Sequence, residues 1–278
     1  MNSDQISGGV VPPGENTDDD ELARDLAAEA GERLLELRAQ GGEPDLLRKT
    51  GDRLSHEFLI QALAERRPGD VVLSEEGADD PARLTADRVW IVDPLDGTRE
   101  FGEPGRTDWA VHVALWQRTS GGTSGGTSGS GELTAGAVAL PAQDRVLSTA
   151  NPPAPLPPFE AGSRRVRIVV SRTRAPRFVQ DVAELIDAEL VPHGSAGAKV
   201  AAVISGEVDA YVHGGGFYEW DTAAPVAVAR AAGLYASRID GAPLRYNQPE
   251  LLMPDILVSR PALANILLEA IREVTNAS

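Results

Sequence analysis

Two segments of the N-terminal half carry apolar residues at helical spacing. The first opens with an acidic run at residues 18–20, which suits the first turn of a helix. Its apolar stripe consists of Leu22, Leu26, Ala30, Leu34 and Leu37. The second segment predicts a helix over residues 52–65, which Pro68 and Gly69 then end.

Short apolar runs rich in β-branched residues predict strands around and after these helices. In the N-terminal half we expect strands at residues 71–74, 89–92, 111–116 and 132–140. The last two read as an antiparallel pair. In the C-terminal half we expect strands at 166–170 and 208–212, and helices at 177–187, 198–205 and 223–232. This alternation indicates a mixed α/β fold.

Breaks in composition suggest how the chain is divided. Residues 1–17 are rich in glycine, proline and acids, which predicts a disordered tail. The proline-rich stretch at 151–158 favours an extended spacer and predicts a boundary between domains at 18–158 and 159–278. A Gly/Thr/Ser repeat at 121–131 interrupts the expected strand pair, and we interpret it as a tolerated flexible insertion.

The composition excludes several classes of protein. The 278-residue chain has a net charge of -16, which argues against a general nucleic-acid-binding or anionic-membrane surface. It has no cysteine, so disulfides, thiolate nucleophiles and zinc-cysteine sites are excluded. No apolar run approaches the roughly 20 residues of a membrane span, and residues 1–20 are polar, without the basic start and apolar core of a secretion signal. We therefore expect a cytoplasmic protein.

The most informative chemistry lies at residues 90–98, Trp-Ile-Val-Asp-Pro-Leu-Asp-Gly-Thr. We expect the strand to stop at Pro94, so that Asp93 and Asp96 point into one space at its end. The Asp-x-x-Asp spacing differs from the Asp-x-Asp of haloacid dehalogenase-type phosphatases, so we interpret the carboxylates as metal ligands and not as a phospho-aspartate nucleophile. On its own, the motif could also be a turn with two solvated aspartates.

The residues that follow Asp93 also predict binding sites for a phosphate group and for a cation. Gly97 permits a close backbone approach to a ligand, and a helix begins at Thr98, where free N–H groups attract phosphate. Carboxylates, together with a backbone carbonyl such as that of Leu95, suit a hard cation like Mg²⁺.

The motif at 90–98 resembles the signature of the inositol monophosphatase superfamily, and further segments follow in the order expected for it. Upstream, residues 71–76 form an apolar strand that ends in paired carboxylates. Downstream lie the Gly-Ser-Ala-Gly-Ala-Lys segment with its sequel at 194–211 and the Trp-Asp element at 219–225. The resemblance implies a layered α-β-α-β-α sandwich of the inositol monophosphatase and fructose-1,6-bisphosphatase type, with the metal site between its halves.

The same resemblance implies roles for particular residues. The ligands that it implies for two or three Mg²⁺ ions are Glu75, Asp93, Asp96, Asp221 and the carbonyl of Leu95. Glu76 is the alternative to Glu75 in the acidic pair. The substrate-binding residues that it implies are Glu75, Asp96, Gly97, Thr98, Ser195, Lys199 and Asp221.

A catalytic pair is implied as well. Asp52 stands where the family places an aspartate near its threonine, here Thr98, to activate the attacking water. The residues before Asp52, Lys49-Thr50-Gly51, depart from the family pattern.

Within the superfamily, the local sequence favours the CysQ-type bisphosphate nucleotidases. Ser195 and Lys199 resemble a variant in which a serine and a lysine face a second anionic group; the alternative for Lys199 is a solvated helix residue. The implied reaction is lithium-sensitive removal of the 3′-phosphate from 3′-phosphoadenosine 5′-phosphate, or from its 5′-phosphosulfate form, by metal-activated water in sulfur assimilation.

Other functions stay open at this point. Inositol-1-monophosphatase, fructose-1,6-bisphosphatase or broad-specificity sugar phosphatase activity is compatible with the motifs, as is a non-catalytic regulator that binds nucleotide and Mg²⁺. Dimerisation is common in the superfamily, but no stretch of this chain identifies an interface.

Overall fold

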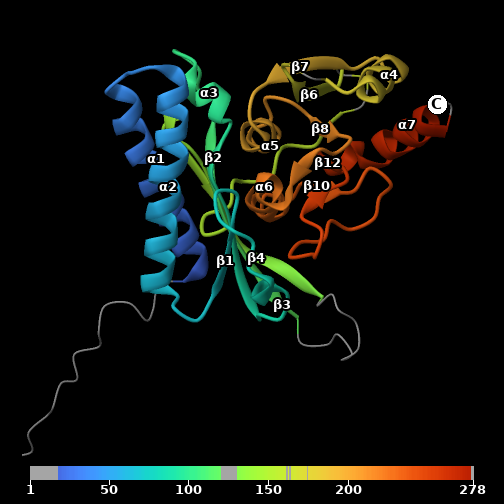
Figure 1. The fold of residues 1–278 in the computed structure, drawn as a ribbon. Helices are drawn as coiled ribbons and strands as arrows, with labels where there is room; N and C mark the ends of the chain where they lie inside the picture. The colour runs from blue at the N-terminus through green and yellow to red at the C-terminus, as the bar shows by residue number, and fades with distance from the viewer. Residues whose placement is uncertain (1–17, 120–129, 161, 163, 174, 277–278) are drawn as a thin grey trace, which may run out of the picture.

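The structure, a computed structural model, consists of alternating layers of helices and sheets. It describes residues 18–119, 130–160, 162, 164–173 and 175–276. The predictions for the N-terminal tail and for most of the Gly/Thr/Ser repeat lie outside these residues. Figure 1 shows a helix pair, a sheet, a second helix pair, a second sheet and a last helix pair, stacked in that order. The predicted α-β-α-β-α sandwich is confirmed.

The first helix layer and the first sheet enclose one hydrophobic core. The helices are α1 (Asp19–Ala39) and α2 (Pro44–Arg66). The sheet has the strand order β1-β2-β3-β4-β5, with β1 (Val71–Ser74), β2 (Arg88–Asp96), β3 (Ala110–Arg118), β4 (Gly131–Leu140) and β5 (Arg145–Ser148). Leu22, Leu26 and Leu34 of α1 are fully buried in the same cluster as Trp90 of β2, so the predicted apolar stripe faces the sheet.

The second sheet has the strand order β10-β12-β8-β6-β7. Its strands are β6 (Arg167–Ser171), β7 (Glu189–His193), β8 (Ala210–His213), β10 (Tyr235–Ser237) and β12 (Ile256–Ser259). The outer helices α4 (Arg177–Leu185) and α7 (Ala264–Asn276) share a core cluster with this sheet. A small sheet pairs β9 (Phe217–Tyr218) with β11 (Leu252–Met253).

The central layer consists of α5 (Ala196–Ile204) and α6 (Glu219–Ala231), which lie between the two sheets. Residues 222–229 of α6 are all buried, because both faces of the helix are covered. It packs closely on β4, where a Cβ added to Gly136 would lie 2.6 Å from the Cβ of Ala227. The short helix α3 (Thr98–Gly102) and the 3₁₀ turns η1 (Pro81–Leu84), η2 (Pro141–Gln143) and η3 (Pro261–Leu263) complete the described elements.

Several predicted boundaries are wrong for identifiable reasons. Helix α2 begins at Pro44 and not at residue 52, because Glu43 caps it by accepting a hydrogen bond from the amide of Leu46. Helix α6 begins at Glu219 and not at residue 223, with Tyr218 as its N-cap. The C-terminal strands and helix after residue 232 were not predicted. The domain boundary near residue 158 stays a prediction.

Among the described residues, the helices lack the combination of length and apolar character that crossing a membrane requires.

Candidate metal centre and active site

Three aspartates from distant parts of the chain meet between the two sheets. Asp93 and Asp96 come from the end of β2, and Asp221 comes from the first turn of α6. One carboxylate oxygen from each lies within 4.8 Å of the others. Asp93 is 1% exposed and Asp96 is 6% exposed, whereas Asp221 is half-buried. The structure therefore brings together three of the predicted site residues.

A bulge in β2 explains the Asp-x-x-Asp spacing. In a regular strand, side chains three positions apart point to opposite faces. Here Asp93 pairs with His112 and Asp96 with Ala110, so β2 has one more residue than β3 between the two pairs. The extra residue returns Asp96 to the face of Asp93. The predicted end of the strand at Pro94 is wrong, because the bulge accommodates a residue without an N–H group.

The first turn of α5 holds Asp96 in place. Oδ1 of Asp96 accepts a hydrogen bond from the amide of Ala196 (3.1 Å), and Oδ2 accepts one from the amide of Gly197 (2.6 Å). These amides belong to the first turn of a helix and have no partner within it. Burial alone would raise the pKa of Asp96, but the positive charges of His112 and Lys199 and the Gly197 amide bring it below its usual range.

His112 on β3 is fully buried and connects the two halves of the site. Its Nδ1 lies 3.1 Å from the carbonyl oxygen of Trp220, to which it must donate because a carbonyl can only accept. Its Nε2 lies 3.2 Å from Oδ2 of Asp96. A Cβ added to Gly197 would lie 2.1 Å from that same Nε2, so the imidazole occupies the space of a side chain there. His112 thus contacts both Asp96 and the residue before Asp221.

The remaining carboxylates repel one another. Burial, then the charges of Glu75, Asp96 and Asp221, raise the pKa of Asp93 well above its ordinary value. Burial and the charge of Asp96 raise the pKa of Asp221 to about 7, although the amide of Tyr218 opposes this. Glu75 follows β1 at the edge of the group. Burial raises its pKa to about 7, although a hydrogen bond with Asp93 lowers it. The site carries an excess of negative charge.

The predicted pair of Asp52 and Thr98 also lies together. The Thr98 hydroxyl lies 3.2 Å from Oδ1 of Asp52 and 3.1 Å from the carbonyl oxygen of Leu95, so its one proton can be donated to either. Asp52 lies on α2 and is half-buried. Burial and the charge of Glu76 raise its pKa to about 6, opposed by the Thr98 hydroxyl.

Gly97 and Ser195 bring β2 and α5 into close contact. Gly97 has a φ of 82°, and a Cβ added to it would lie 2.8 Å from the Cβ of Ser195. Only glycine fits both the backbone angle and this approach. Ser195 is the N-cap of α5, and its Oγ accepts a hydrogen bond from the amide of Ala198 (2.9 Å).

Lys199 is buried and not solvated. It is 6% exposed, so the alternative of a solvated helix residue is wrong. Its Nζ donates to the carbonyl of Gly194 and lies 5.5 Å from the centre of the Tyr211 ring. Burial lowers its pKa, although Asp96 and other carboxylates counter this. Lys199 therefore fixes the loop before α5 and places a positive charge behind Asp96.

The donor set fits a divalent cation such as Mg²⁺. In the part of the chain that the structure describes, Asp93, Asp96 and Asp221 form no ion pair with an arginine or a lysine; their ion-pair contacts within 4.0 Å are those of His112. Several carboxylate oxygens converge, and hard cations prefer such ligands. A bound cation would also relieve the mutual repulsion that raises the pKa values of Asp93 and Asp221.

Two buried residues, one in the site and one two positions before Asp221, were not predicted. His112 lies in an apolar strand, and its position opposite Asp93 becomes visible only once the strand register is known. Glu219 is fully buried and accepts hydrogen bonds from the amides of Asn247 (2.6 Å) and Gln248 (2.8 Å). Burial raises its pKa to about 7. A charged residue directly before the Trp-Asp element was the available signal for Glu219.

Comparison with known proteins identifies the family. The model of the inositol monophosphatase family matches residues 17–276. The chain belongs to this family. Among its relatives, the 3′-phosphoadenosine 5′-phosphate phosphatase of Mycobacterium leprae is 51% identical over 255 residues, which cover 91% of this chain and 93% of that protein. The 3′(2′),5′-bisphosphate nucleotidase CysQ of Escherichia coli K12 is 29% identical over 254 residues, covering 84% and 96%.

A solved structure of the inositol monophosphatase family supports the same conclusion. The crystal structure of CysQ from Bacteroides thetaiotaomicron superposes with a TM-score of 0.71 and 27% identity, covering 87% of this chain and 97% of that one. The family predicted from the motifs is therefore confirmed.

Proposed function

We propose that this member of the inositol monophosphatase family is a Mg²⁺-dependent phosphatase that hydrolyses the 3′-phosphate of 3′-phosphoadenosine 5′-phosphate to AMP and phosphate. The observation that carries the chemistry is the group of three carboxylates within 4.8 Å, which lacks an arginine or lysine partner among the described residues. The choice of substrate is supported by the 51% identity to the mycobacterial phosphatase of that name.

In this proposal, Asp93, Asp96 and Asp221 bind the metal ions, with Glu75 at the edge of the group and the carbonyl of Leu95 as a further oxygen ligand. Divalent ions held there would neutralise the carboxylates, polarise the phosphate and make a water molecule more acidic. The chain contributes a rigid frame, because Asp96 is fixed by two amides of α5 and Asp93 by the amide of Leu95 (3.0 Å).

Asp52 and Thr98 handle the proton of the attacking water. The hydroxyl of Thr98 orients the water, and the carboxylate of Asp52, with a pKa of about 6, is mostly ionised at neutral pH and accepts its proton. The water oxygen bonds to phosphorus as the bond from phosphorus to the ribose 3′-oxygen breaks, and that oxygen takes a proton from solvent.

The loop from Gly194 to Lys199 supports this frame. The Ser195 cap and the Lys199 contact with the Gly194 carbonyl fix the amides that bind Asp96. A direct contact of Ser195, Lys199 or Gly97 with the substrate stays a prediction.

Turnover of three phosphate esters tests the proposal. We expect kcat/KM in Mg²⁺ to be far higher for 3′-phosphoadenosine 5′-phosphate than for inositol 1-phosphate or fructose 1,6-bisphosphate. Asp96→Asn, purified in parallel, controls for a contaminating phosphatase. Preference for one of the other two esters would overturn the proposed substrate but not the proposed metal-dependent phosphatase chemistry. Nucleotide and Mg²⁺ binding without turnover of any ester would indicate a non-catalytic regulator.

A further inference from the structure

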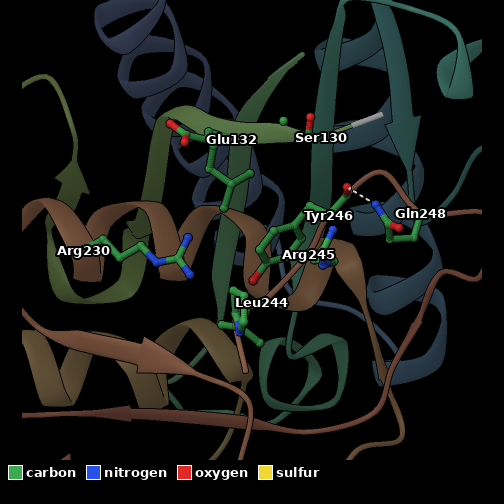
Figure 2. A pocket seen from close by; sticks show the side chains of 10 residues that line it. Ser130, Glu132, Arg230, Leu244, Arg245, Tyr246 and Gln248 are labelled. Carbon is green, nitrogen blue, oxygen red and sulfur yellow. Dashed lines mark hydrogen bonds between the residues drawn. The ribbon is translucent and has the colours of Figure 1, made fainter. Parts of the chain in front are cut away.

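A cavity of about 390 Å³ lies against α6 (Figure 2). Its walls come from the start of β4, the C-terminal half of α6 and residues 243–248. Arg230 lines it from α6, nine positions after Asp221. At ~1.5 Å and ~100° per residue, this places the Arg230 backbone roughly 13 Å further along the helix and on its opposite side. The cavity is therefore separate from the proposed metal site.

Two arginines without carboxylate partners line this cavity. Arg230 has one long contact, from a guanidinium nitrogen to the carbonyl of Ala236 (3.4 Å). Arg245 forms no hydrogen bond or ion pair with any residue that the structure describes. The chain has 42 acidic and 26 basic residues, and most of its described arginines are paired with a carboxylate. Two unpaired arginines in one cavity depart from that pattern.

The acid that lines this cavity does not neutralise them. Glu132 lies at the rim of the cavity, and in Figure 2 its carboxylate points away from Arg245. It makes no ion pair with Arg230 or Arg245. The positive charge in the cavity is therefore available to an anion from solution.

The wall formed by residues 243–248 is fixed by hydrogen bonds. Tyr246 is 3% exposed, and its hydroxyl donates to Oγ1 of Thr222 (3.2 Å). Its carbonyl accepts a hydrogen bond from Nε2 of Gln248 (2.9 Å), the dashed line in Figure 2. The amides of the next two residues donate to buried Glu219. A wall that is ordered beforehand loses little entropy when a ligand binds.

From these observations we propose that the cavity is a second anion-binding site, for a small molecule that carries a phosphate or sulfate group on an organic body. Guanidinium groups bind the oxygens of phosphate and sulfate with strong, charge-assisted hydrogen bonds. Leu133 and Leu244 supply an apolar surface for the organic part. The volume lies within the range of small-molecule pockets, roughly 300–1,000 Å³.

Binding of AMP to the metal-free protein tests this site by itself. In excess EDTA the proposed metal site keeps its uncompensated carboxylates and repels anions, so calorimetric titration with AMP reports on the cavity. The test variant is Arg230→Gln with Arg245→Gln. The matched control is Arg272→Gln on α7, an exposed arginine that also lacks a carboxylate partner among the described residues but does not line this cavity.

We expect AMP to bind the wild type and the Arg272 variant equally, and the double variant to bind at least about tenfold more weakly, because two charge-assisted contacts are lost. Inorganic phosphate should compete with AMP, and adenosine, which has no charge, should not bind. Absence of AMP binding in EDTA, equal binding by the double variant, or adenosine binding as tight as that of AMP would each overturn the proposal. Since no metal and no turnover are involved, the result is independent of the substrate proposed above.

Discussion

A single buried carboxylate, Asp209, and the buried cluster of carboxylates around Asp93 have opposite electrostatics. Asp209, just before β8, is fully buried and accepts hydrogen bonds from Arg164 (2.6 Å) and Arg260 (2.9 Å). Burial would raise its pKa, but the arginines and the amide of Arg167 bring it below its usual range. Asp93 is just as buried, yet its neighbours are other carboxylates, and its pKa is well above the usual range.

The difference separates an acid that holds the fold from acids that need a cation. Asp209 finds its positive partners within the chain, so its charge is satisfied when the protein folds. The acids around Asp93 have too few positively charged partners within the chain, and a metal ion from solution would supply the missing positive charge. Both groups lie in segments that pointed to the same family, so the motif alone does not tell a structural acid from a functional one.

Asp96→Asn should produce the largest effect. Asparagine keeps the shape of the side chain and removes one of the charges that attract the cation. We expect kcat on 3′-phosphoadenosine 5′-phosphate to fall by about a thousandfold or more, with an unchanged circular dichroism spectrum. Asp87→Asn, at an exposed aspartate, is the matched control. Near-normal turnover by the Asp96 variant would contradict the assignment of Asp96 as a metal ligand.

Asp209→Ala should give the complementary result. It leaves the buried guanidinium group of Arg260 and the exposed one of Arg164 without their carboxylate, so we expect the free energy of unfolding to fall by about 3–5 kcal/mol. Denaturant unfolding measures this. The folded fraction should keep its kcat, and a loss of turnover at unchanged stability would contradict the structural role of Asp209.

His112→Ala should have an intermediate effect on the metal site. It removes the link between Asp96 and the carbonyl of Trp220, so we expect Mg²⁺ affinity and kcat/KM to fall by roughly 10–100-fold. His112→Asn can still donate to a neighbouring oxygen and should lose less. Calorimetric Mg²⁺ titration of both variants checks this, and wild-type affinity in His112→Ala would show that the contact has no role.

The smallest effect should appear in the pH dependence of the metal-free protein. The pKa values of Glu75 and Asp221 are raised to about 7 in the folded protein, above those of the unfolded chain. Between the pKa of each acid in the unfolded chain and its raised pKa in the folded protein, the folded state binds more protons than the unfolded state. The free energy of unfolding therefore falls as the pH rises through this range. Asp209, whose pKa is lowered, loses its contribution only on acidification below its ordinary range.

Thermal unfolding in EDTA measures this dependence. We expect the melting temperature of the wild type to fall from about pH 5.5 to about pH 8, and the slope to be shallower for Asp221→Asn. Identical slopes for the two proteins would mean that the pKa of Asp221 is not raised in the folded protein.

The sequence predicted most of the layers and that Asp93, Asp96 and Asp221 lie together, but not the geometry that joins them. The apolar stripe of α1 has helical periodicity and the segments at β3 and β4 are apolar runs, and each element was found. The bulge at Pro94 depends on pairing with β3, which local sequence does not encode. The same is true of His112, whose importance comes from lying opposite Asp93 and next to Gly197. The start of α2 was misplaced because the cap at Glu43 was overlooked.

The central claim is that Asp93, Asp96 and Asp221 hold a divalent cation, and calorimetric titration of the metal-free protein with Mg²⁺ near neutral pH tests it most directly. The account predicts saturable Mg²⁺ binding by the wild type and by Asp209→Asn, and its loss in Asp96→Asn and Asp221→Asn. Absence of binding by the folded wild type, or equal binding by all of these proteins, would contradict it.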